Sequence, residues 1–141
     1  MSRLKWNGAE VEEMLGRVEE AVAANAAVIL SDEVAASMPG RGAGVKGKTA
    51  SGRNIYKPSD KFEPPGVRTG RLRSSIKAAR TSAGKWIMRP GVEYAKFLEL
   101  GTSKMADRNF MLSTSLKDKV QKRMVKHAIK GARKVLGRMS G

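Results

Sequence analysis

The sequence of 141 residues contains no cysteine. This absence excludes a disulfide framework, thiolate metal sites and thiol catalysis, and it fits a protein matured in a reducing cytoplasm. Aromatic residues make up only 5% of the chain. We therefore expect the core to consist of aliphatic side chains and methionine, completed in part by neighbouring subunits. The length is that of one domain, which we place over residues 1–141.

Groups that commonly carry catalysis are also scarce. The only histidine, His127, falls near the charged face of a predicted helix. The sequence has no His-x-x-His, no cysteine pair and no Asp-x-Asp run, so we expect no zinc or EF-hand calcium site. The stretch Gly44–Thr49 lacks the first glycine of a phosphate-binding loop, and no buried strand precedes it. These absences predict that the protein is not an enzyme and has no cofactor.

Long apolar runs are missing as well. The longest, Ala21–Leu30, is interrupted by Asn25 and is too short to span a bilayer. The first six residues lead into an acidic helical pattern and not into the apolar segment of a signal peptide. We expect no membrane partner.

The net charge of +15 is unevenly distributed along the chain. Residues 1–38 carry three basic and seven acidic side chains, a balance of −4, whereas residues 39–141 carry 25 basic and six acidic ones, a balance of +19. This asymmetry is compatible with non-specific contact with nucleic acid, with pairing between the acidic part of one subunit and the basic part of another, or with a solvated basic face.

The first predicted element is a long amphipathic helix over Ala9–Met38, because apolar residues recur at steps of three and four. Asn7 is the expected N-cap, Glu10 stands at the capping-box offset, and Pro39-Gly40 ends the helix. Residues 39–67 read as a long loop, with a flexible segment rich in glycine and lysine at 40–62.

A short helix or turn is predicted over Thr69–Ser75, with Thr69 as a cap and Leu72 pointing inward. A β-hairpin follows over Ile76–Thr81 and Lys85–Arg89. The spacing then predicts a helix over Val92–Leu100 that Gly101 ends in the αL conformation.

The last predicted element is a single long helix over Leu112–Arg138, with one apolar stripe and one strongly basic face. The expected fold is α+β: a long N-terminal helix, a small antiparallel sheet, a short helix and a long basic C-terminal helix. The basic face attracts polyanions but lacks the residues that read base edges.

Two stretches resemble the head–tail joining proteins, also called neck or tail-completion proteins, of long-tailed bacteriophages. Glu63–Ile76 contains Pro-Pro followed by Thr-Gly-Arg-Leu-Arg-Ser-Ser-Ile, which is similar to the family's Thr-Gly-x-Leu-x-x-Ser-Ile. Gly91–Met111 contains Tyr-Ala-Lys-Phe-Leu-Glu-Leu-Gly-Thr, which is similar to the family's Tyr-Ala-x-x-x-Glu-x-Gly-Thr. It then contains Met followed by Arg-Asn-Phe, which is similar to the family's Met-x-x-Arg-Pro-Phe. The resemblance covers residues 63 to about 116. Asn109 replaces the family's proline, and Ser113–Ser115 replace its Pro-Ala-Leu.

The residues that carry this resemblance are also the candidate interface residues: Thr69, Gly70, Leu72, Ile76, Tyr94, Ala95, Glu99, Gly101, Thr102, Met105, Arg108 and Phe110. From their chemistry, Ala95 would allow a close approach to the sheet, Thr102 and Ser103 would bond local backbone, and Arg108 would meet the Glu99 carboxylate. The candidate polyanion contacts are Lys46, Lys48, Arg53, Lys119, Lys122, Arg123 and Lys126.

The resemblance implies a structural virion protein that forms a ring, expected to be sixfold, between the head and the tail. Its partners would be further copies of itself, connector or head-completion proteins, tail terminator or tail tube proteins, and the passing DNA. It would be assembled in the host cytoplasm and located at the head–tail interface of the virion. The alternatives are a basic accessory protein that binds DNA non-specifically and an interaction module of antitoxin or scaffold type.

Overall fold

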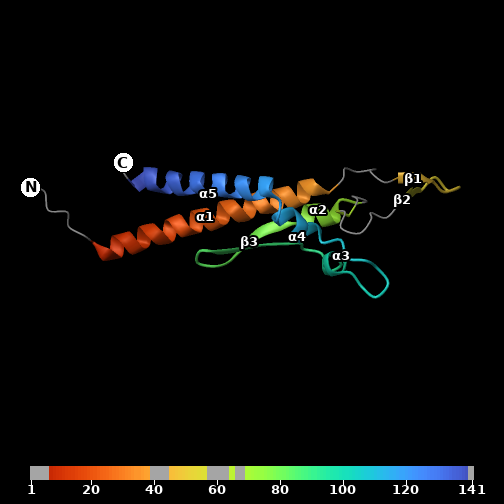
Figure 1. Ribbon diagram of the computed structural model, residues 1–141, viewed down its shortest axis with the longest axis horizontal. Helices are drawn as coiled ribbons and strands as arrows, with labels where there is room; N and C mark the ends of the chain where they lie inside the picture. The colour runs from red at the N-terminus through yellow and green to blue at the C-terminus, as the bar shows by residue number, and fades with distance from the viewer. Residues whose placement is uncertain (1–6, 39–44, 57–63, 66–68, 140–141) are drawn as a thin grey trace, which may run out of the picture.

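The computed structural model describes residues 7–38, 45–56, 64–65 and 69–139 (Figure 1). Its elements are α1 (Gly8–Ser37), β1 (Val45–Lys48), β2 (Asn54–Tyr56), α2 (Arg71–Ser75), β3 (Lys77–Ser82), β4 (Lys85–Arg89), α3 (Ala95–Leu100), α4 (Phe110–Ser115) and α5 (Asp118–Met139). The α+β fold expected from the sequence is confirmed, with long helices at both ends of the chain and small antiparallel sheets between them.

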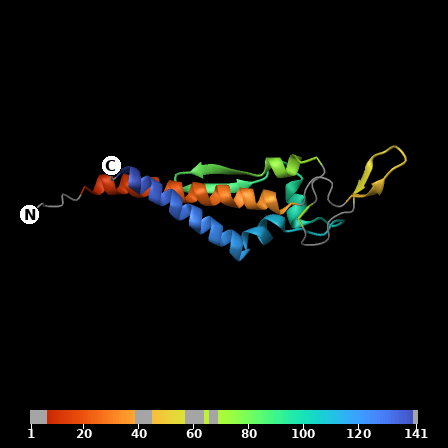
Figure 2. The ribbon, with the colours of Figure 1, turned by 90° about the horizontal axis from the view of Figure 1, so that it is seen from above.

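Helix α1 is the central element of the molecule. Helix α5 runs antiparallel to it along one side, and the β3–β4 hairpin packs on the other side, so α1 lies between them (Figures 1 and 2). The short helices α2, α3 and α4 gather near the C-terminal end of α1 (Figure 1). The β1–β2 hairpin lies at the far end of the molecule, away from the start of α1 and the end of α5.

The predicted bounds of the first helix agree with those of α1 to within one residue. Asn7 is the N-cap residue: its backbone is extended and its carbonyl accepts the N–H of Val11 at 3.2 Å. The predicted N-cap at Asn7 is confirmed, although the Asn7 side chain makes no cap hydrogen bond. The favourable interaction of acidic residues with the helix dipole remains available to Glu10 in the first turn.

The hydrophobic core lies where the C-terminal half of α1 meets the short helices. Val34, Met38, Ile76 and Phe110 form a buried cluster. Around this cluster pack Leu30, Leu72, Met88, Leu98 and Met111. Val34 and Phe110 are fully shielded from solvent, so this cluster joins the C-terminal end of α1 to the start of α4.

The β3–β4 hairpin was predicted correctly, and its strands pair antiparallel from Lys77 opposite Arg89 to Ser82 opposite Lys85. Gly84 takes a φ of 66° in the connecting turn, a conformation that glycine adopts without strain. A two-stranded hairpin alone is marginal in water, and contact with α1 stabilises this one.

The expectation of an unstructured loop over 39–67 is wrong for residues 45–56, which form the antiparallel β1–β2 hairpin. A hydrogen-bonded turn closes it: Thr49 N–H donates to Arg53 O at 2.8 Å, and Gly52, at φ 78°, donates to Thr49 O at 2.9 Å. The remainder of the segment predicted to be flexible, 40–44 and 57–62, lies outside the described residues.

The predicted single C-terminal helix is two helices, α4 and α5, separated at residues 116–117. The Ser113–Ser115 cluster explains the interruption, because serine and threonine hydroxyls compete for helix carbonyls. The Ser115 hydroxyl donates to Leu112 O at 2.7 Å. Asp118 then starts α5 with a negative charge in its first turn.

The predicted helix over Val92–Leu100 begins three residues late, at Ala95, because Val92–Tyr94 form a turn in which Ala95 N–H donates to Val92 O. Gly101 has the expected positive φ of 75°, but its ψ of 179° is not αL. The chain leaves the helix in an extended direction there, toward the bridge between Thr102 and Met105.

Candidate functional site

The stretch that follows β4 folds into a corner centred on the carboxylate of Glu99, which is buried to 9% exposure. One carboxylate oxygen accepts the N–H of Met111 at 3.0 Å and the other accepts that of Leu112 at 2.9 Å. Glu99 on α3 therefore satisfies two of the free N–H groups at the start of α4. Backbone bonds from Arg108 to Leu98 O, 2.9 Å, and from Asn109 to Glu99 O, 3.3 Å, hold the returning chain against α3.

Gly101 occupies the tightest point of this corner. A Cβ added there would lie 2.7 Å from Asp107 N and 2.9 Å from Met105 O, both backbone atoms. Thr102 and Met105 exchange backbone hydrogen bonds of 2.8 and 3.2 Å, and the Thr102 hydroxyl accepts the N–H of Lys104. The predicted bonding of Thr102 to local backbone is thus confirmed.

Among the residues that the structure describes, Asn109 is the only one other than glycine with a positive φ, at φ 43° and ψ 34°. Asparagine tolerates this left-handed conformation, whereas a proline ring fixes φ near −65°. The corner of this chain therefore has a geometry that the family's proline could not adopt at this position.

The first stretch that resembles the family forms the other wall of the same core. The predicted cap at Thr69 is wrong, because Gly70 is the N-cap residue of α2 and no side chain caps this helix. The Thr69 hydroxyl accepts the N–H of Arg71 at 3.4 Å, a local turn contact just before the helix. Gly70 precedes α2 with φ 81°. Leu72 and Ile76 pack in the cluster that also holds Phe110, so the predicted inward direction of Leu72 is confirmed.

The candidate interface residues divide into three groups by exposure. The buried ones are Ile76, Ala95, Glu99 and Phe110. The exposed ones are Thr69, Tyr94 and Thr102, and the half-buried ones are Gly70, Leu72, Gly101, Met105 and Arg108. The predicted Arg108–Glu99 ion pair stays a prediction.

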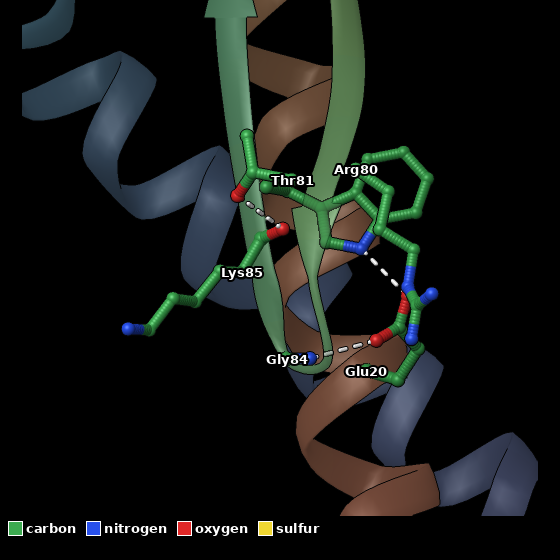
Figure 3. Close-up of polar contacts among 6 residues, drawn as sticks. Glu20, Arg80, Thr81, Gly84 and Lys85 are labelled. Carbon is green, nitrogen blue, oxygen red and sulfur yellow. Dashed lines mark hydrogen bonds and ion pairs between the residues drawn. The ribbon is translucent and has the colours of Figure 1, made fainter.

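A contact that sequence reasoning missed joins the β3–β4 hairpin to α1 (Figure 3). The Glu20 carboxylate accepts three hydrogen bonds, from Arg80 Nε at 2.7 Å, Trp86 Nε1 at 2.8 Å and the Gly84 backbone N–H at 2.8 Å. The Gly84 N–H, followed by the Trp86 and Arg80 side chains, lowers the pKa of Glu20 below its ordinary value. The three partners lie 60, 64 and 66 residues further along the chain, so no local pattern indicates which acidic residue of α1 binds them.

The candidate polyanion contacts are not brought together into one site. Lys119, Lys122, Arg123 and Lys126 are exposed along α5, whereas Lys48 and Arg53 are exposed on the β1–β2 hairpin at the other end of the molecule. The side chain of Lys46 lies outside the described residues. Arg123 forms an ion pair with Glu33 of α1, so it serves in part to hold the two long helices together.

Apolar side chains are exposed on most elements. Thirteen large hydrophobic residues in the described part of the chain are exposed, compared with six large hydrophobic residues that are buried there. The exposed ones are Leu15, Val22, Val28, Ile55, Ile87, Tyr94, Phe97, Leu100, Leu112, Leu116, Val125, Ile129 and Leu136. Single exposed hydrophobic residues are ordinary, whereas exposed apolar residues that adjoin one another on one face mark surfaces that partners cover.

The sequence matches no family model, and neither the curated proteins nor the solved structures compared with it include a similar chain. Among the described residues, no cluster of three or more histidine, cysteine, aspartate or glutamate side chains could hold a metal ion. No helix in the described ranges is both long and apolar enough to cross a membrane.

Proposed function

We propose that this chain is a structural, non-catalytic subunit of a ring at the joint between the head and the tail of a long-tailed bacteriophage. The excess of exposed over buried large hydrophobic residues carries the assembly part of the proposal. A single copy leaves much apolar surface in water, and burial of such surface is the main driving force of protein association. The head–tail part rests on the resemblance over residues 63 to about 116.

The geometry of the corner supports this use of the resemblance. The two similar stretches are separated in sequence, yet Ile76 from the first and Phe110 from the second share one buried cluster. Glu99 of the second stretch caps α4 through two backbone hydrogen bonds. The residues that carry the resemblance therefore form one structural unit, as expected for residues that define a fold.

Closed rings are built from heterologous interfaces, in which two different patches of each subunit meet. The acidic start of α1 and the basic face of α5 provide patches of opposite charge, which steer association and fix its register. Basic side chains of α5 that stay free in the ring would face the DNA that passes through the channel.

The test is assembly in a lysate. Cells that carry the phage genome encoding this chain, with its gene deleted, should accumulate separate heads and tails visible by electron microscopy. Addition of the purified chain should restore joined, infectious particles, and a Phe110→Ala variant, whose core is disrupted, serves as the negative control. Joined particles in normal number without the chain would refute the proposal.

A basic accessory protein that binds DNA non-specifically is the second candidate, because the face of α5 that carries lysine and arginine is exposed. Its discriminating measurement is the affinity of the free chain for random duplex DNA as a function of salt. Tight binding at physiological salt, with a steep salt dependence from many released counterions, favours this alternative. A joint protein should bind duplex DNA only weakly as a free subunit.

A further inference from the structure

Helix α5 presents two different apolar faces, and α1 covers only one of them. Val120, Ala128 and Gly131 are buried against the rest of the chain. Val125, Ile129 and Leu136 are 57%, 47% and 44% exposed, and their spacing of four and seven residues places them on one line of the helix surface. We name these three residues the α5 stripe.

Helix α1 has an exposed line of the same kind. Leu15 and Val22, seven residues apart, are 51% and 36% exposed and share one face. We name them the α1 stripe. Helical geometry places this stripe between the sector of α1 that contacts α5 and the sector that contacts the β3–β4 hairpin.

Both stripes lie on the same side of the pair of long helices. The helices are antiparallel and approach closely at Gly131, where an added Cβ would lie 3.1 Å from Ala21 O. In this arrangement, a groove runs along one side of the line where α1 and α5 meet. The α5 stripe and the α1 stripe both face the opposite side. Ala24 of α1 and Val135 and Arg138 of α5 line that groove.

Charges of opposite sign border the two stripes. Glu12 and Glu19 are exposed three residues before Leu15 and Val22, and we name them the acidic rim. Lys122 and Arg133 are exposed three residues before Val125 and Leu136, and we name them the basic rim. Side chains three or four residues apart are neighbours on a helix surface, so each rim flanks its own stripe.

We propose that the α5 stripe of one copy of the chain packs on the α1 stripe of a second copy, with the basic rim of the first facing the acidic rim of the second. The seven-residue step from Ile129 to Leu136 matches the step from Leu15 to Val22. This shared step and the opposite sign of the rims select another copy of this chain as the occupant. This inference rests on the proposed ring and names the helix faces that join its subunits.

Sedimentation velocity over a concentration series, with native mass spectrometry, tests the apolar part of the interface. Val22→Ser and Leu136→Ser should each weaken self-association about tenfold or more, because each removes a large buried side chain from the interface. Leu100→Ser, on α3, is the matched control: it removes a leucine that is 77% exposed and lies outside both stripes, and should leave association unchanged. Far-UV circular dichroism establishes that every variant is folded.

Charge reversal tests the pairing of the rims. The variant Glu12→Lys/Glu19→Lys and the variant Lys122→Glu/Arg133→Glu should each fail to self-associate, and a mixture of the two should form mixed oligomers. Such rescue in the mixture cannot arise from misfolding of either variant. The inference is overturned if the unaltered chain stays monomeric at its highest soluble concentration, if both serine variants of the stripes associate normally, or if the mixture stays unassociated.

The outcome separates this inference from the proposed function. Normal self-association through the stripes, combined with joined phage particles in the absence of the chain, would refute the head–tail role and leave the interface standing. Restored joining by variants of the stripes that cannot self-associate would refute the interface and leave the role standing.

Discussion

Gly131 and Gly137 lie on the same helix, but the structure gives them opposite roles. A Cβ at Gly131 would lie 2.4 Å from Asn25 Nδ2, 3.0 Å from Asn25 Cγ and 3.1 Å from Ala21 O. The Asn25 side chain cannot move away freely, because its Nδ2 donates to Ala21 O at 2.7 Å. At Gly137, an added Cβ would meet nothing within 4 Å.

Gly137→Ala should stabilise the protein by about 0.5–1 kcal/mol, since alanine loses less backbone entropy than glycine in a helix. Gly131→Ala gains the same term, but a misfit in a packed interface costs about 1–3 kcal/mol. We expect a net loss of about 1–2 kcal/mol for Gly131→Ala.

Urea unfolding followed by circular dichroism measures both changes. With a slope of about 2 kcal/mol per molar urea, the midpoint should fall by about 0.5–1 M for Gly131→Ala and rise by about 0.25–0.5 M for Gly137→Ala. The slopes should stay equal, and all proteins are compared at one chain concentration because association contributes to stability. Equal stabilisation by the two substitutions would show that α1 and α5 do not approach closely at Gly131.

Three further changes test individual contacts. Glu20→Gln should flatten the dependence of stability on pH. The lowered pKa of Glu20 contributes stability that is present above the ordinary glutamate value of 4.5 and lost as pH falls through the lowered value. Unfolding of both proteins across that acidic range checks this, and parallel pH profiles would contradict it. Glu99→Ala should lower the unfolding free energy by about 1–3 kcal/mol, because two N–H groups at the start of α4 lose their acceptor. The control is Glu93→Ala, which removes an exposed carboxylate. An equal loss of unfolding free energy in the two variants would argue against the capping role of Glu99. Asn109→Pro should prevent native folding of the corner, because the proline ring cannot adopt φ 43°. Asn109→Gly should have a small effect, because glycine adopts this φ without strain but loses the hydrogen bond from the Asn109 side chain to Asp107. A native thermal transition for Asn109→Pro would show that the left-handed backbone is not required.

The elements that have a long repeat of apolar residues, or turn residues at both limits, could be predicted from the sequence. Helix α1 repeats its apolar spacing over eight turns, and the β3–β4 hairpin is bounded by a turn containing Gly84 and by Pro90. Leu72 was expected to point inward from its place in the short helix, and it packs against the core cluster. In these segments local preference and tertiary packing agree, so the pattern alone was sufficient.

The missed features depend on contacts between distant segments or on very short signals. The β1–β2 hairpin has strands of four and three residues, too short for alternation to be read among the glycines around it. The break before Asp118 was hidden because the apolar spacing continues across residues 116–117. A glycine inside a helix ordinarily weakens it, and only the position of Asn25 on another helix explains why glycine is needed at Gly131. The Glu20 contact required knowing which turn of α1 the hairpin reaches.

Assembly and contact with DNA place separate demands on α5, and its surface can meet both at once. The α5 stripe and the exposed line of Lys126, Lys130 and Lys134 lie on different sectors of the helix, because steps of four residues keep each line on its own side. Replacement of these three lysines by glutamine should therefore leave the oligomer unchanged while it reduces the salt-dependent attraction to duplex DNA, since up to three fewer phosphates are neutralised. Sedimentation velocity and fluorescence anisotropy on the same samples measure the two properties. Loss of the oligomer in this variant would mean that the lysine line, and not the apolar stripe, carries the contact between subunits.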